Sequence, residues 1–323
     1  MWPSLKELRI IQCDKIEILA EENSSFQQQQ HEHAKRPFFL FEKGSFSNLE
    51  VLYMWFDFNA VLYGMVPLEF FKINHLQMYF GRNTTSAVLS VFLQRLHYLK
   101  TLKLFYGDME EIFINEEPHV FAHLRTLTIS GMHNLIHMRK DNSHVAGPVF
   151  PNLEFLKVED CGRLENLVYS TMSFRNLIKL EVLGCHGLKH LISCSVAKSL
   201  VLLQSMRVEN CQTMVEILAS SDDNGNIDDA DAHEITFGRL KDLKLSNLPN
   251  LKGFCSRNYN VIFPFLTTLS VTRCLEMKIS IDGVLQNDSK HEGVIRITEE
   301  EEQGQDDDNE RNNDDVDEFE KWW

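Results

Sequence analysis

The sequence predicts an α/β solenoid, in which short units repeat along one axis and each unit adds a strand to a parallel sheet. Three observations support this prediction. Apolar residues recur at fixed offsets, the pattern restarts mostly every 24–29 residues, and polar insertions account for the longer intervals. A unit of this length cannot bury its apolar side alone, so stability requires neighbouring units to stack.

The repeat is defined by apolar residues at offsets 0, 3, 5, 8, 11 and 14 from an anchor residue. In the clearest unit these residues are Leu153, Leu156, Val158, Cys161, Leu164 and Leu167. The units anchored at residues 49 and 73 match the pattern only in part. The ten anchors are Leu5, Leu49, Ile73, Leu99, Leu124, Leu153, Leu177, Leu203, Leu240 and Leu266.

Offsets 0, 3 and 5 predict a short strand in which inward and outward residues alternate. The apolar residues at offsets 8, 11 and 14 return the chain over the core. The period is that of leucine-rich repeats, so we expect a horseshoe with a parallel sheet on the concave face and an irregular, 3₁₀ or short helical convex side. The best-matched units place strands near residues 5–10, 99–104, 124–129, 153–158, 177–182, 203–208, 240–245 and 266–271.

Two segments follow from this division of the chain. Residues 1–281 form the predicted repeat domain of about ten repeats, with insertions near residues 21–43 and 220–234. Residues 282–323 form a predicted acidic tail, which we expect to be disordered because it is dense in charge and poor in apolar residues.

The negative charge of the chain is concentrated near its end. Residues 299–323 hold thirteen Asp or Glu against Arg311 and Lys321, so the remainder is nearly balanced although the whole chain has a formal charge of −15. Nucleic-acid partners usually require a large basic face. We therefore expect no nucleic-acid partner.

No membrane span and no secretory signal are predicted. The most apolar stretch, Leu49 to Phe71, contains Glu50, Asp57 and Glu69, which would be costly inside a bilayer. The N-terminal residues lack a basic segment followed by an apolar one. We expect the chain to stay in the cytosol or the nucleus, with its cysteines reduced.

Five of the seven cysteines occupy offset 8, namely Cys13, Cys161, Cys185, Cys211 and Cys274. A small side chain with a weak donor can reach backbone carbonyls from this inward position. The alternative is a metal or thiol ladder built from Cys161, Cys185 and Cys211. The repeat pattern already accounts for each member, so the interpretation is structural.

No enzymatic motif is present. The sequence lacks the glycine-rich phosphate loops, the nucleophile elbow and the zinc-protease helix motif. His31 and His33 lie in a glutamine-rich insertion without further ligands, and residues 220–231 match a calcium loop only in part, with Ser220 and Asp231 at its two end positions. We expect no catalysis, cofactor or metal.

The outward residue at offset 4 of each strand is the candidate protein-binding position. These nine residues are Arg9, Tyr53, Lys103, Thr128, Lys157, Glu181, Arg207, Lys244 and Ser270. Five are basic, so they predict a discontinuous positive stripe on the concave face that attracts an acidic protein surface. The alternative is that Lys and Arg only keep an exposed sheet soluble. A second hypothesis is that residues 299–323 fold back onto the stripe and compete with the partner. The alternative, which we favour, is a solvated tail that only aids solubility.

Several segments resemble the carboxy-terminal leucine-rich repeats of plant intracellular disease-resistance proteins of the coiled-coil, nucleotide-binding class. The resemblance covers roughly residues 1–281. Its specific marks are the Phe150–Cys161 and Ile235–Leu251 segments and the openings Phe150-Pro151 and Phe263-Pro264. It implies a non-catalytic module of innate immunity that recognises a pathogen effector or a guarded host protein and holds a nucleotide-binding domain inactive.

No nucleotide-binding domain or coiled coil precedes Met1, so we expect either a fragment of a longer receptor or a truncated relative. In a fragment, the nucleotide-binding domain would be a partner in cis or in trans. The alternative is a generic intracellular scaffold, such as the substrate-recognition part of a ubiquitin ligase, for which an F-box would be expected near the N-terminus.

Overall fold

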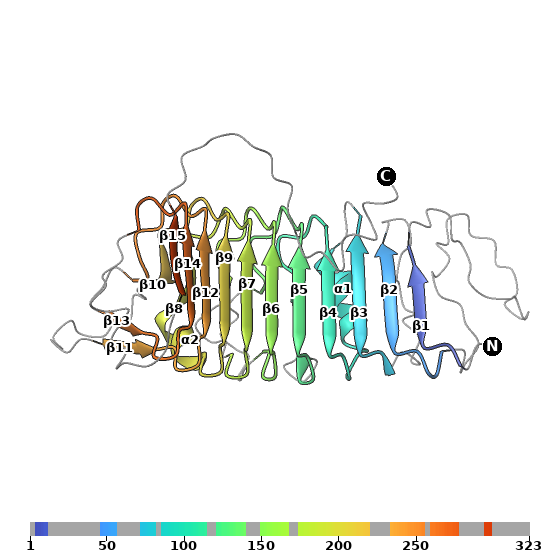
Figure 1. Cartoon of the computed structure of the whole chain (residues 1–323). Coiled ribbons are helices and arrows are strands. Elements are labelled where there is room, and N and C mark those ends of the chain that lie inside the picture. Colours follow the sequence, from blue (N-terminus) through green and yellow to red (C-terminus); the bar gives the residue numbers. More distant parts are fainter. Residues whose placement is uncertain are drawn as a thin grey trace, which may run out of the picture.

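The computed structural model describes residues 4–11, 46–56, 72–81, 85–114, 121–139, 149–167, 174–219, 233–255, 259–277 and 294–298. Within these residues the chain is a parallel β-solenoid with little helix. Its main sheet has eleven strands that follow one another nearly in chain order, as Figure 1 shows. They are β1 (Glu7–Ile10), β2 (Val51–Phe56), β3 (His75–Phe80), β4 (Thr101–Phe105), β5 (Thr126–Ser130), β6 (Phe155–Glu159), β7 (Lys179–Leu183), β9 (Ser205–Glu209), β12 (Asp242–Ser246), β14 (Thr268–Thr272) and β15 (Val294–Thr298).

The predicted register is confirmed. Leu156 pairs with Leu180 and Val158 with Val182 across β6 and β7, so equivalent offsets lie side by side. The six apolar residues of the unit anchored at Leu153 are each no more than 2% exposed. Each strand starts about two residues after its anchor, because the residues from offset −3 to offset 0 form a turn. In the unit anchored at Leu153, the Leu153 N–H closes this turn by donating to the Phe150 carbonyl over 3.4 Å.

The sheet extends beyond the units that match fully. β2 and β3 come from the two partial repeats, and both pair in register with their neighbours. β15 pairs with β14, although residues 294–298 lie in the predicted tail. This strand therefore continues the sheet within the predicted tail, and the boundary at residue 281 stays a prediction. The insertion at 21–43, most of that at 220–234, and residues 278–293 and 299–323 lie outside the described residues.

The side of the solenoid behind the sheet carries short elements. Helix α1 (Ser86–Leu93) lies behind β3 and β4, and α2 (Cys194–Ser199) contacts β8, β10 and β11 (Figure 1). Two small parallel sheets join β8 (His190–Ser193) to β10 (Glu216–Ala219) and β11 (His233–Thr236) to β13 (Tyr259–Ile262). The predicted form of the convex side and the horseshoe curvature stay predictions.

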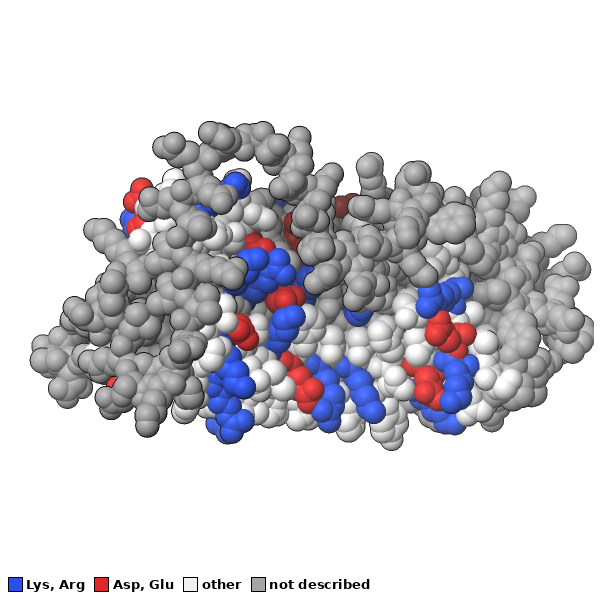
Figure 2. All heavy atoms as spheres, in the orientation of Figure 1, with Lys and Arg blue, Asp and Glu red and all other residues white. Residues whose placement is uncertain are grey.

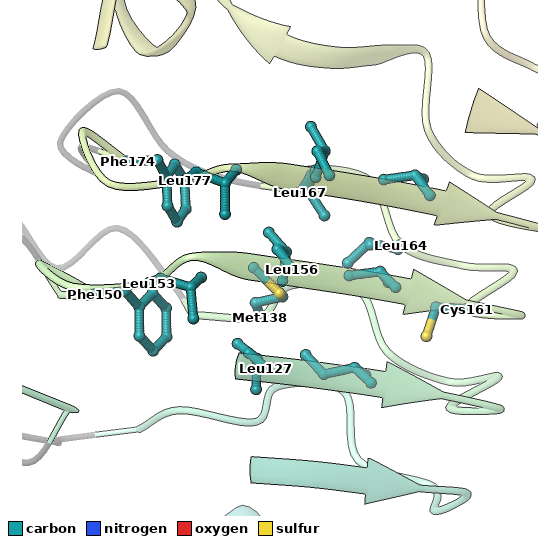
Figure 3. Close-up of a cluster of buried hydrophobic side chains, with 14 of the residues drawn as sticks. Leu127, Met138, Phe150, Leu153, Leu156, Cys161, Leu164, Leu167, Phe174 and Leu177 are labelled. Atoms are coloured by element: carbon teal, nitrogen blue, oxygen red, sulfur yellow. The ribbon is translucent and has the colours of Figure 1, made fainter. Parts of the chain in front are cut away.

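The core is one continuous row of leucine, phenylalanine and sulfur-containing side chains between these two sides. Figure 3 shows Leu177 over Leu153 and Leu156 over Leu127, each pair coming from adjacent units. A second, aromatic row was not predicted from the leucine pattern. Phe113, Phe121 and Phe150 form it, with ring centroids 5.0–5.4 Å apart, and Phe46, Phe174, Phe237 and Phe263 occupy the same offset, −3, as Phe121 and Phe150 in other units.

Each main-sheet strand from β4 to β14 is followed by a residue in the left-handed backbone region. The residues at offset 7 have φ between 51° and 68°, and in chain order they are Tyr106, Gly131, Asp160, Gly184, Asn210, Asn247 and Arg273. Glycine, asparagine and aspartate adopt this conformation at the lowest cost. The turn is thus a backbone requirement that every unit with a described strand end from β4 to β14 repeats.

Replacement of Leu180 by alanine should destabilise the protein by about 2–5 kcal/mol, because a buried leucine loses both transfer energy and packing. Leu180 is 1% exposed. The matched control is Lys179→Ala, next to it on the outward face, which should cost at most about 1 kcal/mol as an exposed ion-paired residue. Denaturant unfolding measures both, and equal losses would contradict the inward assignment of Leu180.

Gly184→Ala should destabilise the chain by more than about 1 kcal/mol. Gly184 has a φ of 62°, and an added Cβ would lie 2.3 Å from Oδ1 of Asp160. Gly162→Ala is the control, since its added Cβ meets no atom within 4 Å. If thermal unfolding showed the same midpoint shift for both variants, the left-handed turn would not be the constraint described here.

Candidate protein-recognition surface

The nine candidate residues lie in a single row across the outer face of the main sheet, which faces the viewer in Figure 1. Strand pairing places Arg9 beside Tyr53, Lys157 beside Glu181 and Lys244 beside Ser270. The same row also contains Gln77 on β3 and Arg296 on β15. Offset 4 of the unit anchored at Ile73 would have identified Gln77, whereas Arg296 lies beyond the predicted domain and has no anchor.

The row is not uniformly accessible. Arg9 and Lys244 are exposed, whereas Thr128 and Glu181 are only 6% and 8% exposed. The remaining members, of intermediate exposure, are Tyr53, Lys103, Lys157, Arg207 and Ser270. A partner that lies on this face can therefore reach most, but not all, of the predicted positions.

Carboxylates neutralise most of the predicted positive stripe. Nζ of Lys157 lies 3.0 Å from Oε2 of Glu159, and Nη2 of Arg207 lies 2.8 Å from Oε2 of Glu209. Lys244 contacts the other oxygen of Glu209 at 2.8 Å. The prediction considered offset 4 alone, but alternation also brings offsets 2 and 6 to this face. The stripe is thus a ladder of ion pairs, as the mixed colours in Figure 2 show.

Glu209 is the centre of this ladder. Its partial burial alone would raise the pKa of its carboxyl group, but hydrogen bonds from Arg207 and Lys244 outweigh burial and leave that pKa lowered. The hydrogen bond to Glu209 in turn raises the pKa of Arg207. Glu209 and Arg207 are therefore charged at neutral pH, and the carboxylate of Glu209 lies between two basic side chains.

The other half of the outer face carries an aromatic cluster, formed by Trp55, Tyr79, Phe105 and Tyr106. The ring of Tyr79 stacks on Trp55, with centroids 5.8 Å apart, and on Phe105 at 4.9 Å. Tyr106 lies 6.4 Å from Tyr79 and is 42% exposed. Trp55, Tyr79 and Phe105 occupy offset 6, where β6 and β9 carry Glu159 and Glu209.

Glycine positions the exposed ring of this cluster. A Cβ on Gly131 would lie 2.7 Å from Cδ1 of Tyr106, so only glycine leaves room for that ring. At the edge of the cluster, the Tyr53 ring lies 5.6 Å from His75 and beneath the guanidinium of Arg9, whose Cζ is 4.5 Å from the ring centroid. The aromatic residues at offset 6 are outward positions of β2–β4, so strand alternation applied to offset 6 would have identified them.

The cysteines at offset 8 are structural. Cys161, Cys185 and Cys211 are 0% exposed, and each thiol donates to the carbonyl two residues earlier over 3.3–3.4 Å. A hydrogen bond with the Cys161 thiol, together with burial, raises the pKa of Cys185. Burial raises the pKa of Cys211 to about 12. These thiols are poor nucleophiles because the thiolate is the reactive form. Cys13 lies outside the described residues.

Comparison with protein families matches residues 166–281 to plant disease resistance protein RPS2-like, leucine-rich repeats. This part of the chain is similar to the leucine-rich repeats of those plant proteins. Comparison with the curated proteins finds no match for the chain.

The RPS2-like repeats include β7, β9, β12 and β14, whereas the aromatic cluster of β2–β4 lies before the matched segment. Among the described residues, no three His, Cys, Asp or Glu side chains are arranged to hold a metal ion. None of the helices in the described part of the chain is long and apolar enough to span a membrane. His31, His33 and the loop at residues 220–231 lie outside the described residues.

The free energy of unfolding should fall as the pH rises above about 9. Folding raises the pKa of the Cys211 thiol from the ordinary value of 9.0 to about 12. The protonated thiol therefore contributes its full share of the free energy of unfolding below pH 9, and this share is lost as the pH rises toward 12. The slope for one such group is at most about 1.4 kcal/mol per pH unit. Urea unfolding at several alkaline pH values measures it, with Cys211→Ala as the comparison. An identical slope in that variant would contradict the assignment.

Proposed function

We propose that this protein is a non-catalytic recognition module of plant innate immunity, and that the outer face of its main sheet contacts the recognised protein. The match to disease-resistance repeats supports the biological setting. The sheet has eleven adjacent strands, and outward residues such as Arg9, Tyr106 and Lys244 are exposed on its outer face. The expected partner is a pathogen effector or a guarded host protein, met in the cytosol or the nucleus.

The observation that carries the proposal is the aromatic cluster of β2–β4. Protein interfaces are enriched in tyrosine and tryptophan at their centres, and a few such residues carry most of the binding energy. Tyr106 is exposed, and Trp55 and Tyr53 are half-buried, so each presents part of a ring held in place by its neighbours. Stacking fixes these rings in advance, which lowers the entropy lost when a partner binds.

The ion-paired half of the face has a different role in this proposal. Lys157, Arg207 and Lys244 already have carboxylate partners, and exchanging such pairs for pairs across an interface gains little free energy. Their fixed pattern of alternating charge orients a partner and excludes partners with the wrong pattern. The rings supply affinity, and the ladder supplies specificity.

The full receptor arrangement is part of the same proposal. In a longer chain, these repeats would also contact a nucleotide-binding domain and hold it inactive until a partner binds. The RPS2-like segment, residues 166–281, is the natural place for this contact, since it is the part that the family shares. The aromatic cluster, outside that segment, is then left for the recognised protein.

The test uses the variant Trp55→Thr with Tyr106→Asn. Threonine retains strand preference at Trp55, and asparagine tolerates the left-handed φ of 57° at Tyr106, so both rings are removed with little effect on folding. Proteins captured from infected plant tissue on the wild-type chain should bind this variant at least about 30-fold more weakly, as loss of about 2 kcal/mol implies.

Lys189→Ala, an exposed change far from the cluster, is the matched control and should bind as the wild type does. Circular dichroism establishes that the variants are folded. Unchanged affinity in the folded ring-deletion variant would reject the aromatic cluster as the contact surface.

A further inference from the structure

Positive charge collects along the edge of the sheet at which the strands begin. Seven cations lie at offsets −2 to +1 in the described units, and all are exposed. We call this set the strand-start rim, and its members are Lys6, Lys72, Lys100, Arg125, Arg175, Arg239 and Lys241. Figure 2 shows these blue side chains recurring along the lower border of the face, where the arrows of Figure 1 begin.

Few carboxylates balance this rim. At the same offsets the described units contain two acids, Glu50, which lies 3.5 Å from Lys6, and Glu154, which pairs with Arg125. Lys100, Arg175, Arg239 and Lys241 form no ion pair with any described residue, in contrast to the cations of the outer face. The rim is therefore where the unneutralised positive charge of the described sheet is concentrated.

The opposite edge, where the strands end, has the reverse balance. At offsets 7 to 12, which form the turns after the strands, the described units carry the acids Asp108, Glu110, Glu111, Asp160, Glu165 and Glu276. The cations in the same turns are Arg163, Lys189, Lys252 and Arg273. The two edges thus differ in sign, and a polyanion is attracted to the strand-start rim rather than to the sheet as a whole.

The chain itself contains a polyanion. Residues 299–323 carry thirteen acids and two cations, and they follow directly on β15, which ends at Thr298. Twenty-five residues can span up to roughly 80–90 Å, whereas eleven strands at about 4.8 Å spacing span about 50 Å. Every cation of the rim is within reach, and covalent attachment gives the segment an effective concentration on the order of millimolar.

We propose that residues 299–323 bind the strand-start rim of the same molecule. This assignment replaces the expected contact with the outer face, because the cations there are already paired with Glu159 and Glu209. A nucleic acid fits the rim less well, because Glu50 and Glu154 interrupt it and a polyanion from solution has to compete with an attached one. The segment shields the rim from other acidic surfaces and leaves the aromatic cluster of β2–β4 on the neighbouring face.

Zero-length carbodiimide cross-linking of the full chain tests the contact, because it joins a lysine amine to a carboxylate only where the two already touch. Mass spectrometry of the monomer should show residues 299–323 joined to Lys6, Lys72, Lys100 and Lys241, and not to Lys189 and Lys252 on the opposite edge. The yield should fall several-fold at about 1 M salt, where charges are screened over about 3 Å. Equal yields at both edges, or none at the rim, would overturn the proposal.

Two matched variants of the full chain separate a specific rim from general attraction. In one, Lys100, Arg175, Arg239 and Lys241 are each changed to Gln. In the other, Arg163, Lys189 and Lys252 are changed to Gln and Arg273 to Asn, which removes the same charge from the opposite edge. The radius of gyration at low salt should increase in the first variant and stay at the wild-type value in the second.

The same increase in the radius of gyration in both variants, or an increase in neither, would contradict a rim-specific contact. Binding of a nucleic acid to the rim, the competing possibility, is tested with a fluorescent single-stranded oligonucleotide at about 0.15 M salt. Binding to the intact chain that disappears in the first variant would overturn the proposal, since the attached segment would not be occupying the rim.

Discussion

Every feature of this protein depends on the burial of each unit against the next. The six apolar offsets of one unit are exposed no more than 2% only because neighbouring units cover them, and hydrophobic burial of this kind is the main favourable term in folding. The parallel register follows from it, because a shift of one residue would turn Leu156 or Leu180 outward. The outward rows are a by-product of that register. Surface residues from units far apart in sequence are thereby brought into straight lines.

How much of this could be predicted depends on which residues the core constrains. The inward offsets, the strands from the best-matched units and the role of Cys185 and Cys211 follow from periodicity, because burial restricts each of them to a small apolar set. The outward positions could be placed but not interpreted, since nothing in the core fixes their charge. Lys157 suggested a positive stripe, and only its distance to Glu159 shows that the stripe is neutralised.

Two further features could not be predicted from the apolar offsets. β15 has no anchor of the repeat pattern, so its place beside β14 comes from pairing and not from leucine spacing. The aromatic cluster lies in units whose pattern is incomplete, and its exposure depends on a left-handed turn at Tyr106 and on space left by Gly131. Such backbone and packing details have no counterpart in a list of apolar offsets.

The pairing of β9 with β12 shows how such a protein can diversify. Met206 lies beside Leu243, 37 positions later in the sequence, whereas Leu156 and Leu180 are 24 positions apart. The sheet keeps its register across both intervals, and doubling the length of a connection adds only about 0.6 kcal/mol of loop entropy. Selection can therefore lengthen, shorten or rewrite the segments between strands while the scaffold stays unchanged. New outward surfaces can therefore arise without passing through unstable intermediates.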